Sequence, residues 1–111
     1  ADKFEQFYNA IIKKLKAKNI TVLLCTPAAI GEKTDFSNEL DGDLNKYAGI
    51  IRNIAKNNNC ALIDLRKSFL DYNVANNPDN KDRNILTSDG VHLNEKGNRL
   101  VAERMMEALV K

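Results

Sequence analysis

The segment "NITVLLCTP" at residues 19–27 decides the fold of this chain. It is a continuous aliphatic and β-branched run that ends at Pro27, and it lacks the alternation of a strand with one face in water. Such runs are typical of strands buried on both faces, which occur in parallel sheets covered by helices. We therefore expect an α/β fold built around a parallel sheet.

A second run, "CALIDL" at residues 60–65, has the same character. Between the two runs, residues 39–57 carry apolar side chains at helical spacing, and the asparagines that follow end this pattern. A strand, a helix and a second strand in this order predict a βαβ unit, with parallel strands and a right-handed crossover.

Further helices are predicted over residues 2–18, 66–73 and 94–110, the last of them capped by Asn94. The loop at residues 28–38 joins the first strand to the central helix. We expect the apolar stripes of the first and last helices to face the core. These stripes consist of Phe4, Phe7, Tyr8, Ile11, Ile12 and Leu15, and of Leu100, Val101, Met105, Ala108 and Leu109.

The size of the chain limits how complete this fold can be. A chain of 111 residues suits one domain. Two strands that are apolar on both faces, with three or four helices, make a sheet too small to cover itself. The pattern therefore indicates part of a larger α/β fold.

Composition excludes two classes of partner. The 17 basic and 15 acidic residues are interspersed and give a net charge of +2, so we expect no nucleic acid partner. The longest apolar run is far too short to span a membrane. Cys25 and Cys60 stand in strand-like runs and are expected to be buried, reduced thiols, offset too far along the strands to form a disulfide.

The only histidine of the chain, His92, follows Asp89 by three residues in the stretch "LTSDGVHLNEKG" at residues 86–97. At this spacing the carboxylate of Asp89 can accept a hydrogen bond from the imidazole Nδ1–H, which fixes the tautomer and leaves Nε2 as a base. The spacing alone is a weak signal, because a lone loop histidine is usually structural or solvated.

The wider pattern, Asp-Gly-Val-His-Leu-Asn-x-x-Gly, resembles the last conserved block of the SGNH hydrolases, the GDSL-type esterases and lipases. In that family the block precedes the C-terminal helix of a flavodoxin-like parallel sheet sandwiched by helices. The order of the other predicted elements agrees with this layout. The resemblance implies that residues 1–111 are the C-terminal portion of a single α/β domain, with about two parallel strands and three to four helices. The N-terminal part of the domain would then not be in this chain.

The resemblance assigns Asp89 as the acid and His92 as the general base of a Ser-His-Asp triad in an ester hydrolase. The family's serine lies in a Gly-Asp-Ser block, and its oxyanion hole uses a glycine and an asparagine from two further blocks. None of these blocks occurs in this sequence, and Ser37, Ser68 and Ser88 have other surroundings. We therefore expect the chain alone to be inactive.

The resemblance also implies a substrate, a small ester or an acylated carbohydrate. Ala28, Ala29 and Ile30, in the loop after the first strand, are then candidate substrate contacts. The small sheet implies a missing N-terminal segment or a second chain that completes it. No cofactor is expected.

Other kinds of site fit the sequence less well. Glu39, Asp41 and Asp43 do not form an EF-hand, since Arg52 stands where that loop needs a glutamate, and a solvated helix start is expected there. One histidine without a cysteine pair at ligand spacing does not make a closed zinc site. The alternative to a hydrolase is a non-catalytic α/β binding or assembly module, which the absent nucleophile and the small sheet would explain.

Overall fold

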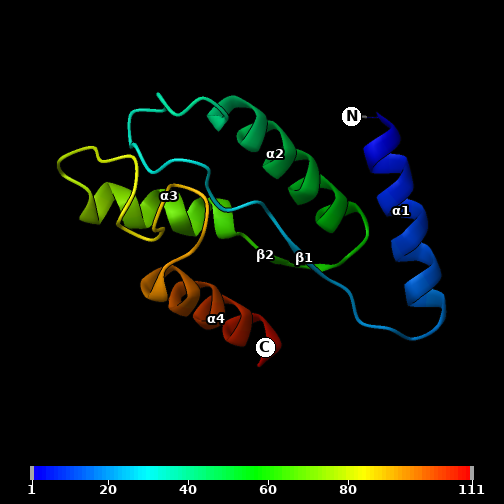
Figure 1. Cartoon of the computed structure of the whole chain (residues 1–111). Coiled ribbons are helices and arrows are strands. Elements are labelled where there is room, and N and C mark those ends of the chain that lie inside the picture. Colours follow the sequence, from blue (N-terminus) through cyan, green and yellow to red (C-terminus); the bar gives the residue numbers. More distant parts are fainter. Residues whose placement is uncertain (1, 111) are drawn as a thin grey trace.

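The computed structural model describes residues 2–110, so Ala1 and Lys111, at the two ends of the predicted domain portion, lie outside the described residues. Figure 1 shows the arrangement of the helices and strands. Within this range the order is α1 (Asp2–Ala17), β1 (Leu23–Cys25), α2 (Asp41–Asn57), β2 (Ala61–Ile63), α3 (Leu65–Asn76) and α4 (Glu95–Leu109).

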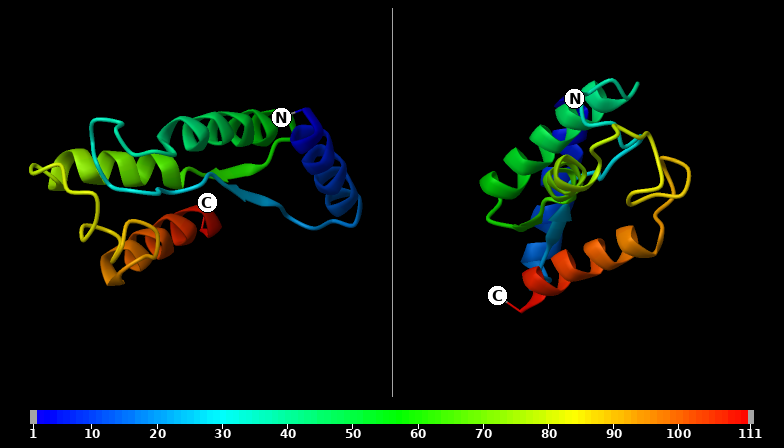
Figure 2. Two further views of the ribbon diagram at one scale, coloured as in Figure 1. Left: turned by 45° about the horizontal axis from the view of Figure 1, so that its top comes forward. Right: turned by 90° about the vertical axis from the view of Figure 1, so that its left-hand side faces the viewer.

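The predicted βαβ unit is confirmed. Strands β1 and β2 pair in parallel, with Leu23 opposite Ala61 and Cys25 opposite Ile63. The strands lie between α2 and α4 in the views of Figures 1 and 2, and α1 packs against α2 beyond the end of the sheet. None of the helices described over residues 2–110 has the length and apolar character needed to cross a bilayer.

The strands are shorter and less buried than their sequences predict. Each has three residues, Leu23 and Leu24 are only half-buried, and Cys25 is exposed. The prediction of strands buried on both faces is therefore wrong for β1, and in β2 only Ile63 is buried, while Ala61 is exposed and Leu62 is half-buried. The sheet within residues 2–110 has two strands, so each strand has one edge without a neighbouring strand. Both cysteines are free thiols, as expected, but Cys25 is exposed and Cys60 is only half-buried, so the expectation that both are buried is wrong.

The apolar stripe of α1 is only partly covered. Ile12 is buried, but the side chains of Phe7 and Tyr8 are 65% and 39% exposed. Phe4 contacts Tyr8 and Tyr47, with ring centroids 4.6 and 5.3 Å apart. The prediction that these aromatic residues belong to the core is wrong for Phe7 and Tyr8, since α1 contacts one helix and no face of the sheet covers the rest.

The apolar side of helix α4 is buried near its start and exposed toward its end. Leu100 is buried against Phe69 and Leu86, and these three residues form a core cluster beneath the loop that precedes α4. Toward the end of the helix, Met105 is 39% exposed and Leu109 is 65% exposed, contrary to the predicted inner face. The start of α4 is therefore its firmly packed part.

The first turn of α4 is fixed by two residues of the "LNEKG" stretch. The side chain of Asn94 accepts a hydrogen bond from the Gly97 N–H at 2.9 Å, as the predicted cap requires. Gly97 is buried, and a Cβ at this position would overlap the carbonyl oxygen of Leu86. The absence of a side chain at residue 97 therefore lets α4 begin directly against the preceding loop.

We expect Gly97→Ala to lower the free energy of unfolding by about 1–3 kcal/mol, because the added methyl group must displace the backbone of Leu86. Gly49→Ala is the matched control. Its added Cβ meets nothing within 4 Å in the interior of α2, so the stability should rise by about 0.5–1 kcal/mol. Urea denaturation of both variants measures the difference. Equal stabilities of the two variants would contradict the close approach at Gly97.

Candidate active site

The stretch that carries Asp89 and His92 is a tight loop before α4. Thr87 and Leu93 form an isolated antiparallel bridge, and the Ser88 N–H donates to the His92 carbonyl at 2.9 Å. The side-chain nitrogen of Asn94 donates to the carbonyl of Thr87 at 3.3 Å. These bonds close the loop at its base, and at its tip Ser88, Asp89, Val91 and His92 are exposed while Gly90 is buried.

Asp89 and His92 lie in direct contact, as the Asp-x-x-His spacing predicts. One carboxylate oxygen of Asp89 accepts from the backbone N–H groups of Val91 and His92, at 2.9 and 2.7 Å. The other lies 2.7 Å from Nδ1 of the His92 ring. The His92 side chain is 80% exposed, and among residues 2–110 its ring makes hydrogen bonds only through Nδ1. Nε2 is therefore free to meet a reacting group.

The same hydrogen bonds govern the charge of Asp89. The backbone N–H of His92 first, then that of Val91 and the His92 ring, stabilise the ionised carboxylate and lower the pKa of Asp89 well below its usual range. An ionised Asp89 acts only as an acceptor, so the His92 nitrogen that faces it has to carry the proton. This geometry holds the imidazole in the tautomer that a general base requires.

A hollow of about 410 Å³ adjoins the pair, and Ile30, Asp89 and Val91 line it. Of the three predicted substrate contacts, only Ile30 lies there. Ala28 and Ala29 pack against the core cluster instead. The other charged residues of the lining are Lys33, Glu39, Asp82 and Arg83.

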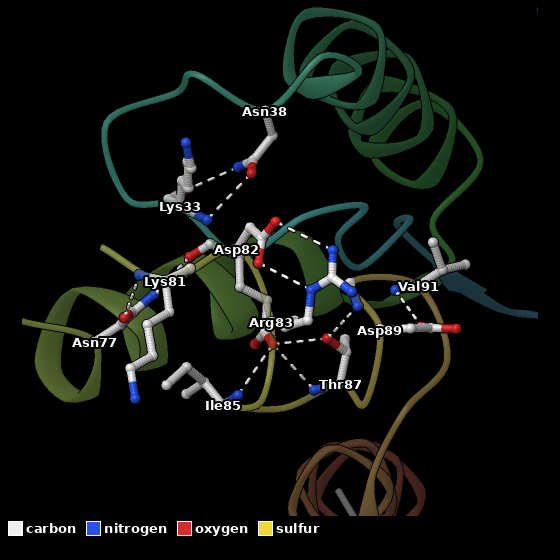
Figure 3. A network of polar contacts seen from close by, with 12 residues as sticks. Lys33, Asn38, Asn77, Lys81, Asp82, Arg83, Ile85, Thr87, Asp89 and Val91 are labelled. Atoms are coloured by element: carbon white, nitrogen blue, oxygen red, sulfur yellow. Dashed lines mark hydrogen bonds and ion pairs between the residues drawn. The ribbon is translucent and has the colours of Figure 1, made fainter. Parts of the chain in front are cut away.

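Beneath the loop lies a buried carboxylate, that of Glu32, which sequence reasoning missed. Its side chain is 2% exposed. One oxygen accepts from the N–H groups of Ile85 and Thr87, both at 3.1 Å, and from the Thr87 hydroxyl at 2.7 Å. The other accepts from the Leu86 N–H at 2.7 Å and the Asn73 amide at 3.3 Å. Figure 3 shows Ile85, Thr87 and Asp89 on this loop.

A second buried polar group fixes the start of the loop at residues 28–38. The guanidinium of Arg66 is 2.8 Å from the carboxylate of Asp41, and both side chains are almost fully buried. Arg66 also donates to the side chain of Asn45 and to the carbonyl of Ala28. Asp41 is therefore not the solvated helix start that the sequence predicts, because a basic residue of α3 reaches it through the core.

The three serines lie in separate surroundings. Ser37 bonds to the side chain of Asp35, and Ser68 accepts from Arg104 at 3.0 Å. Ser88 lies on the same loop as His92, but its hydroxyl faces the backbone carbonyl of His92 at 3.5 Å. The structure thus brings no serine hydroxyl of the described residues to Nε2.

In the part of the chain that the structure describes, no three side chains of the histidine, cysteine, aspartate and glutamate types gather in a group that could hold a metal ion.

The α/β layout and the Asp-His loop before the last helix match a known family. Residues 1–100 fit the model of the GDSL-like Lipase/Acylhydrolase family, and the chain belongs to this family. A search of the curated proteins gives no match.

Solved structures resemble the chain as well. An acetyl xylan esterase, AlAXEase, is 67% identical, with a TM-score of 0.94 over 97% of this chain and 55% of its own. A catalytic mutant of Axe2, an acetylxylan esterase from Geobacillus stearothermophilus, is 17% identical and shares the fold, with a TM-score of 0.79 over 98% of this chain and 47% of its own. The chain thus spans about half the length of each of these two structures.

We expect the Asp89 carboxyl group to titrate below the ordinary aspartate range. Since its pKa is lowered by folding, the ionised group stabilises the loop above that range, and this contribution is lost as the pH falls through the folded pKa. The carboxyl carbon shift of Asp89, followed by NMR against pH, measures this directly. His92→Ala should leave much of the effect, because the two backbone donors remain. Titration in the ordinary range in the unaltered chain would contradict the geometry of the loop.

Proposed function

We propose that this chain supplies the acid–base half of an ester hydrolase active site, with His92 as general base and Asp89 as the residue that orients it. The contact between Nδ1 and the Asp89 carboxylate, in the loop that opens α4, carries this proposal. Membership of the acylhydrolase family supports it.

The chemistry follows from the free Nε2 of His92. Nε2 removes the proton of a serine hydroxyl as its oxygen attacks the ester carbonyl carbon, and the ionised Asp89 stabilises the imidazolium. The tetrahedral intermediate collapses and the imidazolium protonates the leaving alcohol, which leaves an acyl-serine. Water then attacks the acyl group in the same way and releases the acid.

The nucleophile and the oxyanion donors are proposed to lie outside these 111 residues. The Ser88 hydroxyl contacts the backbone carbonyl of His92 and not its ring. Removing a single oxyanion donor typically costs about 100- to 1,000-fold in rate. The isolated chain, without serine and donors, should therefore hydrolyse esters no faster than the background reaction.

The proposed substrate is an acetylated carbohydrate of the xylan type. The 67% identical structure is titled an acetyl xylan esterase, and this supports the substrate class for the present chain. The hollow beside Asp89 suits a hydrated, polar ligand, since its lining combines Ile30 and Val91 with charged side chains. Ile30 remains a proposed substrate contact. Ala28 and Ala29 would act on the ligand only through the backbone or by supporting the loop.

We further propose that an N-terminal segment completes the sheet. The open edge of β1 and the exposed side chains of Phe7 and Leu109 are surfaces that further strands and helices would cover. The 55% coverage of the acetyl xylan esterase structure supports this proposal.

The test uses the complete gene product that contains these 111 residues, assayed on 4-nitrophenyl acetate and acetylated xylan. His92→Ala should lower kcat by roughly 10³- to 10⁴-fold or more, because a triad without its base retains only binding and oxyanion stabilisation. Ser88→Ala is the matched control and should retain activity. The 111-residue chain alone, with or without His92→Ala, should match the background.

Three results would contradict the proposal. The gene product could lack a Gly-Asp-Ser block after a strand, or His92→Ala could keep kcat within tenfold, and either would favour a non-catalytic module. A serine-dependent burst from the 111 residues alone would overturn the placement of the nucleophile outside them.

A further inference from the structure

The Glu32 carboxylate meets the loop of Asp89 and His92 immediately upstream of the pair. Its two oxygens accept from the successive N–H groups of residues 85–87 and from the Thr87 hydroxyl, at 2.7–3.1 Å. Every hydrogen-bond partner of the Glu32 side-chain oxygens in the described part of the chain is an N–H or O–H donor, which matches an ionised carboxylate. A buried charge without such donors would be strongly unfavourable, so the loop and Glu32 depend on each other.

Thr87 extends this contact to the tip of the loop. Its hydroxyl donates to Glu32 at 2.7 Å and accepts from the Gly90 N–H at 2.9 Å. The carbonyl of Gly90 accepts in turn from the N–H of Gly31, the residue before Glu32, at 2.7 Å. Residues 31–32 thus hold the turn between Asp89 and His92 at both backbone groups of Gly90. The Gly90 N–H is held through the Thr87 hydroxyl, and the Gly90 carbonyl is held directly by the N–H of Gly31.

The position of Gly90 makes this restraint relevant to the pair. Gly90 has a φ of +94°, so the chain reverses there, and the N–H groups of the next two residues point back at Asp89. These N–H groups align the carboxylate that contacts the His92 ring. If the turn were held less firmly, water would replace these N–H donors, and the Asp89 carboxylate would be less well aligned with Nδ1 of His92.

We propose that Glu32 is a positioning residue for the Asp89–His92 pair and that it acts through the Thr87 hydroxyl and the Gly90 peptide. The importance of this positioning for catalysis rests on the proposed function, but the contacts themselves do not depend on any substrate. Glu32 touches neither Asp89 nor His92 in this arrangement, so it is not a catalytic residue.

Three variants of the complete gene product that contains these 111 residues test the relay. Glu32→Gln is nearly isosteric, but its amide nitrogen has to face N–H donors, whichever way the amide turns. Thr87→Val removes the hydroxyl and keeps the shape. Thr87→Ser restores the hydroxyl and serves as the conservative rescue. Glu103→Gln, on the exposed face of α4, is the matched control for loss of one negative charge.

The readout is the pKa of the Asp89 carboxyl group, followed by its carboxyl carbon shift, beside the melting temperature of each variant. In Glu32→Gln and Thr87→Val we expect the Asp89 pKa to rise toward the ordinary aspartate value of about 3.9. Thr87→Ser and Glu103→Gln should keep it low. The amide shifts around the Arg66–Asp41 pair, which shares no contact with the loop tip, should stay unchanged in Thr87→Val.

A purely structural role would lower the melting temperature and leave the Asp89 pKa low, and this result would overturn the proposal. If Glu32→Gln does not fold, the comparison of Thr87→Val with Thr87→Ser decides the question, because only the serine variant keeps the hydroxyl that contacts Glu32 and Gly90. If the Asp89 pKa responds as expected while His92→Ala leaves the complete protein active, the positioning stands and the hydrolase assignment fails.

Discussion

The burial of one carboxylate, that of Glu32, is the constraint on which the arrangement of the site depends. A charged group that is 2% exposed needs a full set of donors, and the N–H groups of residues 85–87 supply most of them. This requirement joins the loop after β1 to the loop before α4, although 53 to 55 residues separate the partners along the chain. Leu86, whose N–H donates to Glu32, also belongs to the core cluster with Phe69 and Leu100.

Two layers of order therefore support the Asp89–His92 contact. The inner layer is local: the backbone donors of the turn and the Asn94 cap hold the loop that precedes α4. The outer layer is the Glu32 carboxylate with its relay through Thr87. The exposed ring of His92 thus stands on a loop held by many hydrogen bonds, which suits the proposed general base, because a preorganised group reacts without rearranging first.

The features that the sequence predicts correctly are those that nearby residues determine. The βαβ unit, the Asn94 cap and the contact between Asp89 and His92 depend on neighbours within a few residues or on a simple apolar run. Glu32 and Asp41 were not predicted to be buried, since their donors come from distant segments and a carboxylate in a polar loop gives no sign of them. The aromatic stripe of α1 was predicted to be core from its spacing alone, yet spacing does not say whether another element covers the stripe, and Phe7 lies open.

The tautomer of His92 is the most direct test of the acid–base arrangement. Long-range proton–nitrogen correlations of the neutral ring, recorded on the complete gene product that contains these 111 residues, distinguish a proton on Nδ1 from a proton on Nε2. We expect the proton on Nδ1, facing the ionised carboxylate of Asp89 across the 2.7 Å contact, with Nε2 unprotonated. A ring that carries its proton mainly on Nε2 would contradict the role of Asp89 and leave His92 unable to act as the base.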